Sequence, residues 1–164
     1  MGVNEELQSV NKTTKKQYLL FLSGKELYAI EALKAQEIVE YSEVTKIPMM
    51  NSFVKGVTNI RGNIVPVIDL LDRFDLGKTS IGKKTSIVVT NYMDNEDISQ
   101  IGIIIDEVYE VDMISNSDLR AAAEFGSKVD AKFIQNMGKY NNEYIPILNT
   151  QTILNIDELS KLKG

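Results

Sequence analysis

The stretch from residue 56 to residue 71 limits what this chain can fold into more than any other part of the sequence. Two runs rich in β-branched residues, 57–60 and 64–68, are separated by an Arg-Gly-Asn tripeptide at 61–63. Val, Ile and Thr favour strands, whereas Gly and Asn adopt the positive φ angles of a tight hairpin turn at little cost. The stretch therefore predicts two antiparallel strands joined by a short turn.

Two residues of this predicted hairpin need a separate explanation. Pro66 has no backbone N–H to donate, so its strand is expected to lie at a sheet edge or a bulge at that point. Arg61 places a charged side chain at the hairpin end, which neither turn geometry nor core packing requires. Either a hydrogen bond within the protein that holds the turn or a contact to a partner would account for this arginine.

The same pattern of short strands continues along the chain. One helical turn is expected at 69–74. A carboxy-terminal helix is expected over 150–162, because the apolar residues there follow near-helical spacing. About ten short strands at regular spacing predict an all-β protein, and strands this short close best into small barrels. The further strands are expected at 18–22, 27–30, 86–89, 101–106, 108–111, 133–139 and 144–149.

Three other segments carry weaker signals. Residues 1–16 are polar and are expected to form a flexible tail. Residues 91–100 contain Asp94-Asn95-Glu96-Asp97 and are interpreted as an exposed loop. Residues 31–40 consist of good helix formers, so propensity alone predicts a helix there.

Charge and composition exclude several classes of function. The net charge of −5, with no large Lys/Arg cluster, disfavours a nucleic-acid-binding barrel, and seven Tyr, five Phe and no Trp offer few stacking platforms. The absence of His and Cys excludes Ser-His-Asp triads, cysteine nucleophiles and zinc sites built on these ligands. The amino terminus lacks the features of a signal peptide, and no apolar run could span a bilayer, so a cytoplasmic protein is expected.

Residue spacing argues against three possible chemical sites. Asp69 and Asp72 could share one face of a helical turn, but Asp69 capping that turn is the favoured interpretation. Gly77-Lys78-Thr79 lacks the upstream glycine of a phosphate-binding loop, and the acidic run at 94–97 lacks the Gly and Glu of a calcium loop. A small hydrolase fails for want of a base, so no catalytic, cofactor or metal site is expected.

The 15 positions from Gly56 to Leu70, reading Gly-Val-Thr-Asn-Ile-Arg-Gly-Asn-Ile-Val-Pro-Val-Ile-Asp-Leu, resemble the central signature of CheW-type chemotaxis coupling proteins. The resemblance covers roughly residues 17–154. It implies an all-β fold of two five-stranded SH3-like barrels packed on a shared core, with short helical turns and a carboxy-terminal helix. One such domain would occupy 17–164. Against the helix propensity of 31–40, it favours a short helical turn near 32–34 and then a strand from about Gln36.

The resemblance also implies a function. Proteins of this family are non-catalytic adaptors that join the cytoplasmic tips of chemoreceptors to the regulatory domain of the histidine kinase CheA, at receptor arrays on the inner face of the membrane. They use no cofactor, bind no nucleic acid and do not insert into the membrane. The alternative is the same fold serving as a regulatory module of a larger signalling kinase or receiver-containing protein.

Family roles transfer to this chain only at matching positions. Arg61 and Glu37 match residues of the receptor and kinase contact surface, and Asn59 stands in the same motif as Arg61. Gly56 opens the signature, where a side chain would crowd the strand entry. The remaining candidates are Ala35, which takes a kinase-facing position often held by a bulkier aliphatic residue, and Ser86 and Val111 at the receptor-binding groove, with core packing as the alternative for Val111.

Overall fold

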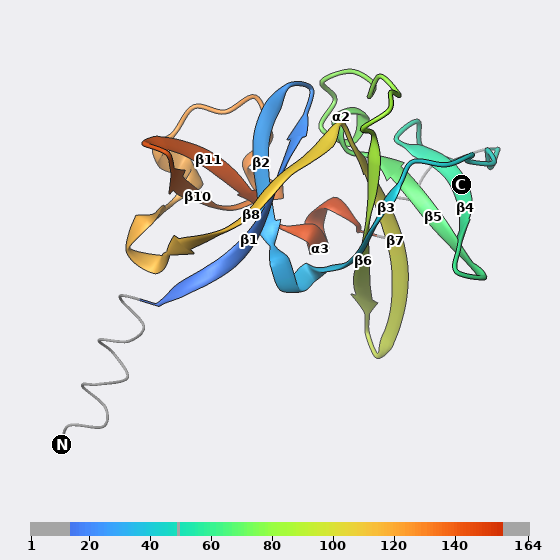
Figure 1. Ribbon diagram of the computed structural model, residues 1–164, viewed down its shortest axis with the longest axis horizontal. Helices are drawn as coiled ribbons and strands as arrows, with labels where there is room; N and C mark the ends of the chain where they lie inside the picture. Colours follow the sequence, from blue (N-terminus) through green and yellow to red (C-terminus); the bar gives the residue numbers. More distant parts are fainter. Residues whose placement is uncertain (1–13, 49, 156–164) are drawn as a thin grey trace.

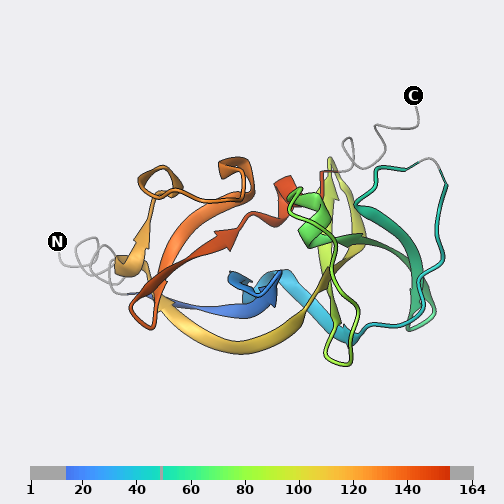
Figure 2. The ribbon, with the colours of Figure 1, turned by 90° about the horizontal axis from the view of Figure 1, so that it is seen from above.

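Two β-sheets packed side by side make up almost all of the structure (Figures 1 and 2). The computed structural model describes residues 14–48 and 50–155. The first sheet has the order β8-β1-β2-β11-β10-β9 and the second the order β3-β6-β7-β5-β4. No helix within these residues is long and apolar enough to cross a membrane.

The strands of the first sheet come from both ends of the chain, and those of the second from its middle. The first sheet contains β1 (Lys15–Ser23), β2 (Glu26–Glu31), β8 (Glu107–Ser115), β9 (Leu119–Arg120), β10 (Ile134–Tyr140) and β11 (Glu143–Leu148). The second contains β3 (Ala35–Glu40), β4 (Val54–Ile60), β5 (Asn63–Asp69), β6 (Ser86–Asp94) and β7 (Asp97–Ile105). The helical elements are α2 (Leu70–Arg73), α3 (Thr150–Ile153) and the 3-10 turns η1 (Ala32–Lys34), η2 (Asn116–Asp118), η3 (Ala122–Glu124) and η4 (Ala131–Phe133).

Three groups of buried side chains explain why the two sheets form one body. One group fills the second sheet's barrel, around Val67, Ile87 and Val89, and another fills the first sheet's barrel, around Leu20 and Ile147. The largest group lies between the sheets and takes residues from both, including Leu19, Phe21, Ile68, Val88 and Ile103. Alternation along β1 sends Leu20 to one core and its neighbours to the other, as the period of two in a strand requires. The expected two-barrel, all-β fold with a shared core is confirmed, and the two-residue strand β9 adds a sixth strand to the first sheet.

The central hairpin forms as predicted, with one change at its turn. Strands β4 and β5 pair up to Ile60 opposite Asn63, so the turn consists of Arg61 and Gly62, with φ of 52° and 84°. Asn63 therefore belongs to the strand, and the arginine itself adopts the left-handed conformation. Pro66 lies just before the part of β5 that pairs with β7, so the sheet-edge expectation holds for this residue but not for its whole strand.

The segment 31–40 follows the family and not its helix propensity. Residues 32–34 form the single turn η1, and β3 then pairs with β6 from Ala35 opposite Thr90 to Glu40 opposite Ser86. Every second residue of β3 is half-buried, because one face of the strand covers the barrel. Tertiary pairing thus overrides a weak local preference.

Three sequence-based expectations differ from the structure. Residues 91–100 are not a loop: β6 and β7 continue as a paired hairpin to Asp94 opposite Asp97, because backbone pairing tolerates polar side chains on an exposed ladder. The predicted tail of 1–16 ends earlier, since Lys15 and Lys16 already pair with β8, and its first 13 residues lie outside the described residues. The carboxy-terminal helix is described only as the single turn α3, and the rest of its predicted span from 156 also lies outside them.

Arg73 joins the two halves of the structure. Its guanidinium carbon lies 4.6 Å from the ring centre of Phe53 and 4.7 Å from that of Phe133. Its Nε donates to the backbone oxygen of Ile153 at 2.8 Å, and a terminal nitrogen donates to that of Thr152 at 3.0 Å. This buried arginine therefore satisfies carbonyl groups of α3 from α2.

Candidate interaction surface

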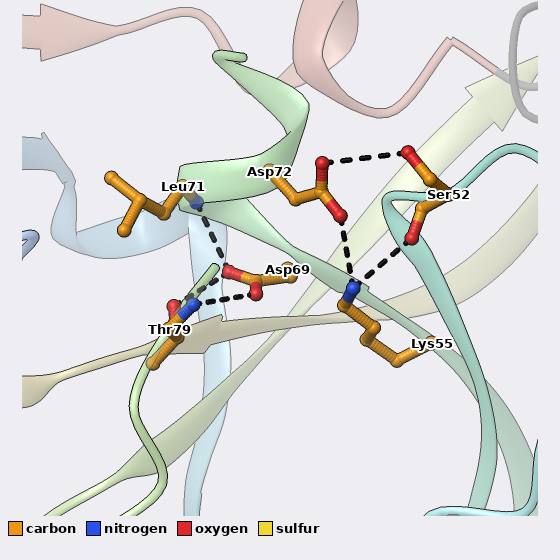
Figure 3. Close-up of polar contacts among 6 residues, drawn as sticks. All are labelled: Ser52, Lys55, Asp69, Leu71, Asp72 and Thr79. Carbon is orange, nitrogen blue, oxygen red and sulfur yellow. Dashed lines mark hydrogen bonds and ion pairs between the residues drawn. The ribbon is translucent and has the colours of Figure 1, made fainter. Parts of the chain in front are cut away.

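The one carboxylate pair that the sequence offered for chemistry is fully occupied by structural contacts (Figure 3). Asp69 is buried, and its carboxylate accepts hydrogen bonds from the backbone N–H of Leu71 at 3.1 Å and from the N–H and hydroxyl of Thr79 at 2.8 and 2.6 Å. Asp72 lies near the surface and binds the ammonium group of Lys55 at 2.9 Å. Asp69 thus caps α2, as favoured from the sequence, and ties the segment around Thr79 to it.

Removing the Asp69 carboxylate is expected to destabilise the protein strongly. In Asp69→Ala, three donors lose their acceptor in a buried place, so we expect the free energy of unfolding to fall by about 3 kcal/mol. Urea unfolding followed by circular dichroism measures this loss. The control is Asp72→Ala, which removes the ion pair with Lys55 and a long hydrogen bond from the Ser52 hydroxyl near the surface, and should cost about 1 kcal/mol. Equal losses in the two variants would contradict the structural role of Asp69.

Arg61 and Glu37 form an ion pair that connects the hairpin turn to β3. The Arg61 Nε donates to a carboxylate oxygen of Glu37, although β3 and β4 are the two outer strands of their sheet. The Glu37 side chain is 21% exposed, but that of Arg61 is 79% exposed. No other hydrogen bond of this guanidinium is found among the described residues, so most of its donors face outward.

Asn59 supports the same turn from inside the hairpin. Its side-chain oxygen accepts the backbone N–H of Gly62 at 2.9 Å, which fixes the conformation in which Arg61 is presented. Glu37, Asn59 and Arg61 therefore form one polar group on the surface, which we call the hairpin patch. Ile64, the second residue after the turn and the ladder partner of Asn59, is 65% exposed and was not singled out as a contact residue from the sequence.

Gly56 acts through the backbone at the other end of β4. It is buried and has a φ of 144°, and a Cβ atom there would lie 1.9 Å from the carbonyl oxygen of Thr45. Thr45 exchanges two backbone hydrogen bonds of 2.8 Å with Val57, the next residue of β4. The glycine thus lets the segment before β4 close the barrel, and it presents no side chain to a partner.

Ala35 and Ser86 are not brought to the hairpin patch as a single cluster. Ala35 begins β3 and packs half-buried against the core between the sheets. Ser86 begins β6 opposite Glu40, at the other end of β3, and its hydroxyl donates to the backbone oxygen of Lys84 at 2.9 Å. Both are half-buried, so each offers a partner little more than part of its surface.

Val111 lies in the other sheet and is exposed. It is on the outer strand β8, opposite Leu19 of β1, and 52% of its surface is accessible, so the core-packing alternative is wrong. Tyr109 and Met113 on the same strand are 52% and 46% exposed, which makes an apolar surface that we call the β8 strip. The alternating residues of 108–111 predicted a strand, but only the sheet order reveals that this strand is an edge.

Tyr140, at the end of β10, contacts two residues of β8. The hydroxyl of Tyr140 donates to the carboxylate of Glu110, and its ring meets that of Tyr109 edge-on at 6.4 Å. This hydrogen bond, with smaller contributions from burial and nearby negative charge, raises the pKa of Tyr140 to about 12. Figures 1 and 2 place β8 and β3 along the same side of the molecule.

Comparisons with known proteins agree with this geometry. The family model described as CheW-like domain matches residues 17–158. The chain is 32% identical to chemotaxis protein CheW of Klebsiella aerogenes, over 91% of this chain and 87% of that protein. It is 31% identical to chemotaxis protein CheW of Bacillus subtilis, over 87% and 88%.

A solved structure shares the fold. The crystal structure of scaffolding protein TtCheW from Thermoanaerobacter tengcongensis superposes with a TM-score of 0.78 at 28% sequence identity. The superposition covers 88% of this chain and 91% of that one. Its two-subdomain β fold is the one described above for the two sheets.

Proposed function

This chain belongs to the CheW-like domain family and is a chemotaxis scaffold, and from that premise we propose that it couples chemoreceptor tips to the histidine kinase CheA. The observation that carries the proposal is Arg61, a 79% exposed arginine at a hairpin turn, which binds Glu37 through Nε and has no other hydrogen bond to a described residue. Arginine is among the residues that most often dominate binding at protein interfaces. Its exposure and its place in the family signature support a contact role.

The two parts of the surface suit different contacts. The hairpin patch offers charge and hydrogen-bond donors at the end of β4, while the β8 strip offers exposed apolar area on the other sheet. We assign Val111, with Ser86, to the helical tip of a receptor, and Ala35 to the kinase. Apolar surfaces that accept one face of an amphipathic helix are a recurrent mode of recognition.

The protein acts in this proposal without catalysis and at the cytoplasmic side of the membrane. The chain has no His or Cys, and its buried Asp69 is occupied by structural hydrogen bonds. The alternative, a regulatory module of a larger kinase or receiver-containing protein, is not favoured, because the proteins it resembles are CheW proteins. The function of the chain would then reside in which surfaces it can bind at the same time.

Reconstitution tests the proposal directly. The full chain is mixed with receptor-containing membranes and CheA, the membranes are sedimented, and kinase autophosphorylation is measured in parallel. We expect the chain to sediment with receptor membranes and to make kinase activity depend on receptor. Membranes without receptor are the control. Equal sedimentation with those membranes, or receptor control of the kinase without this chain, would overturn the proposal.

A further inference from the structure

A hollow of about 460 Å³ lies at the end of the β1–β2 hairpin, and none of the candidate interaction residues lines it. Its walls come from the hairpin turn, from α2 and the segment after it, from the corner between β7 and β8, and from the loop at 128. The Lys25 backbone N–H donates to the Asp106 carboxylate at 3.1 Å, which fixes the hairpin turn to the β7–β8 corner. Four separate parts of the chain thus meet around one space.

Positive charge gathers in this hollow. Lys25, Lys78 and Lys128 come from three segments distant in sequence, and none of them forms an ion pair with a described residue. The carboxylates of Glu26 and Asp106 also line the space, and that of Asp106 already accepts the hairpin N–H. The three ammonium groups outnumber the carboxylates, in a chain whose net charge is −5.

A buried hydroxyl group without a partner lies in the wall of the hollow. Ser23 is 0% exposed, and its Oγ makes no hydrogen bond within the part of the chain that the structure describes. Buried polar groups are almost always hydrogen-bonded, because an unsatisfied group loses its water contacts without compensation. Ser23 belongs to the wall of the hollow, and because its Oγ is covered, a bound molecule could provide the missing partner only after the side chains over this hydroxyl move aside.

The turn at the rim of the hollow has an unusual backbone conformation. Gly24 and Lys25 form the two-residue turn with φ of 58° and 68°. A lysine rarely adopts a positive φ, and here the Asp106 contact holds it in place at the rim.

We propose that this hollow binds a small phosphorylated metabolite. Its phosphoryl group would contact the three lysine ammonium groups, because Lys binds phosphate as a compact point charge. A local shift of the side chains that cover Ser23 would add a hydrogen bond from its hydroxyl. The volume falls within the roughly 300–1,000 Å³ of small-molecule sites and exceeds the need of a phosphate ion alone. An organic portion of the ligand would therefore lie against Leu71 and Leu76 on the apolar wall.

The test is a titration of the full chain, labelled with ¹⁵N, by inorganic phosphate and by glycerol phosphate at constant ionic strength. We expect saturable shifts of the amides at residues 24–25, 78–80 and 128, with glycerol phosphate binding more tightly. Lys78→Ala should weaken binding about tenfold. Lys83→Ala, an exposed lysine outside the hollow, should leave it unchanged. Acetate at equal concentration should produce no saturable shift.

Ser23→Ala tests whether the unpaired Ser23 hydroxyl serves ligand binding or is only a defect of packing. Without anion, we expect its midpoint of thermal unfolding to be equal or higher, because an unsatisfied buried hydroxyl is removed. Its affinity for glycerol phosphate should nevertheless fall several-fold. The absence of saturable shifts, equal shifts with acetate, or full affinity in Lys78→Ala would overturn the site. None of these results bears on the adaptor function, which uses other residues.

Discussion

Gly56→Ala is expected to lower the free energy of unfolding by about 3 kcal/mol or more, or to prevent cooperative folding altogether. The new Cβ would lie 1.9 Å from the Thr45 carbonyl oxygen, a backbone atom held by paired hydrogen bonds to Val57. Overpacking of this kind costs about 1–3 kcal/mol. The φ of 144° adds roughly 1–3 kcal/mol of backbone strain for any residue with a side chain.

Two other glycines separate these contributions. Gly62 has a positive φ of 84°, but a Cβ atom added there would have no neighbour within 4 Å, so Gly62→Ala should cost only the backbone part, about 1–2 kcal/mol. Gly82 has neither a positive φ nor a near neighbour, and Gly82→Ala should be close to neutral. Urea unfolding measures all three variants. A loss in Gly56→Ala no larger than in Gly62→Ala would show that Thr45 moves away freely.

Arg61→Ala is expected to fold normally and to fail in receptor–kinase assembly. An ion pair at the surface contributes at most about 1 kcal/mol, so the free energy of unfolding should change little. Loss of a central arginine at an interface costs about 2 kcal/mol of binding free energy or more, which is about 30-fold in affinity. Sedimentation with receptor membranes and CheA measures this effect.

Exchanging the charges of Arg61 and Glu37 distinguishes a contact to a partner from an ion pair that only holds the hairpin. The double variant Arg61→Glu with Glu37→Arg can restore an ion pair between the same positions with reversed polarity. If the pair only holds the hairpin, assembly should recover in the double variant. We expect stability to recover and assembly to remain lost, because a negative charge now stands at the exposed position.

A second surface ion pair provides the matched control for these variants. Lys16 binds Glu31 at 3.7 Å on the other sheet, and Lys16→Ala should leave assembly unchanged. Unchanged binding of both partners by Arg61→Ala, or recovery in the double variant, would contradict the contact role of Arg61. An equal loss in Lys16→Ala would point to a general effect of charge.

Local sequence patterns were sufficient where neighbouring residues decide the structure. The hairpin around Gly62 and the capping role of Asp69 both depend on turn chemistry or on side chains a few residues apart. Local sequence patterns failed where the structure of a segment depends on the strand with which it pairs. The helix formers at 31–40 became a turn and a strand because β6 offers Ala35 and its successors a ladder.

The candidate site divides in the same way. The family signature identified Arg61, but its partner Glu37 lies 24 residues earlier and was placed beside it only by closure of the barrel. Val111 could have been core or surface, because an apolar residue in a strand has the same local pattern in either place. Its position on an edge strand exposes it, together with Tyr109 and Met113, which no local pattern selects.

The sequence by itself determined the kind of protein: an all-β chain of short strands, without His or Cys, bearing an arginine at the end of its central hairpin. Only the tertiary structure decided that the close neighbour of Gly56 is the Thr45 carbonyl, that Arg61 meets Glu37, and that three lysines from distant segments line one hollow. The physical reason is that strand periodicity specifies which face of a strand is buried. The order in which strands join a sheet depends on contacts between residues far apart in the chain.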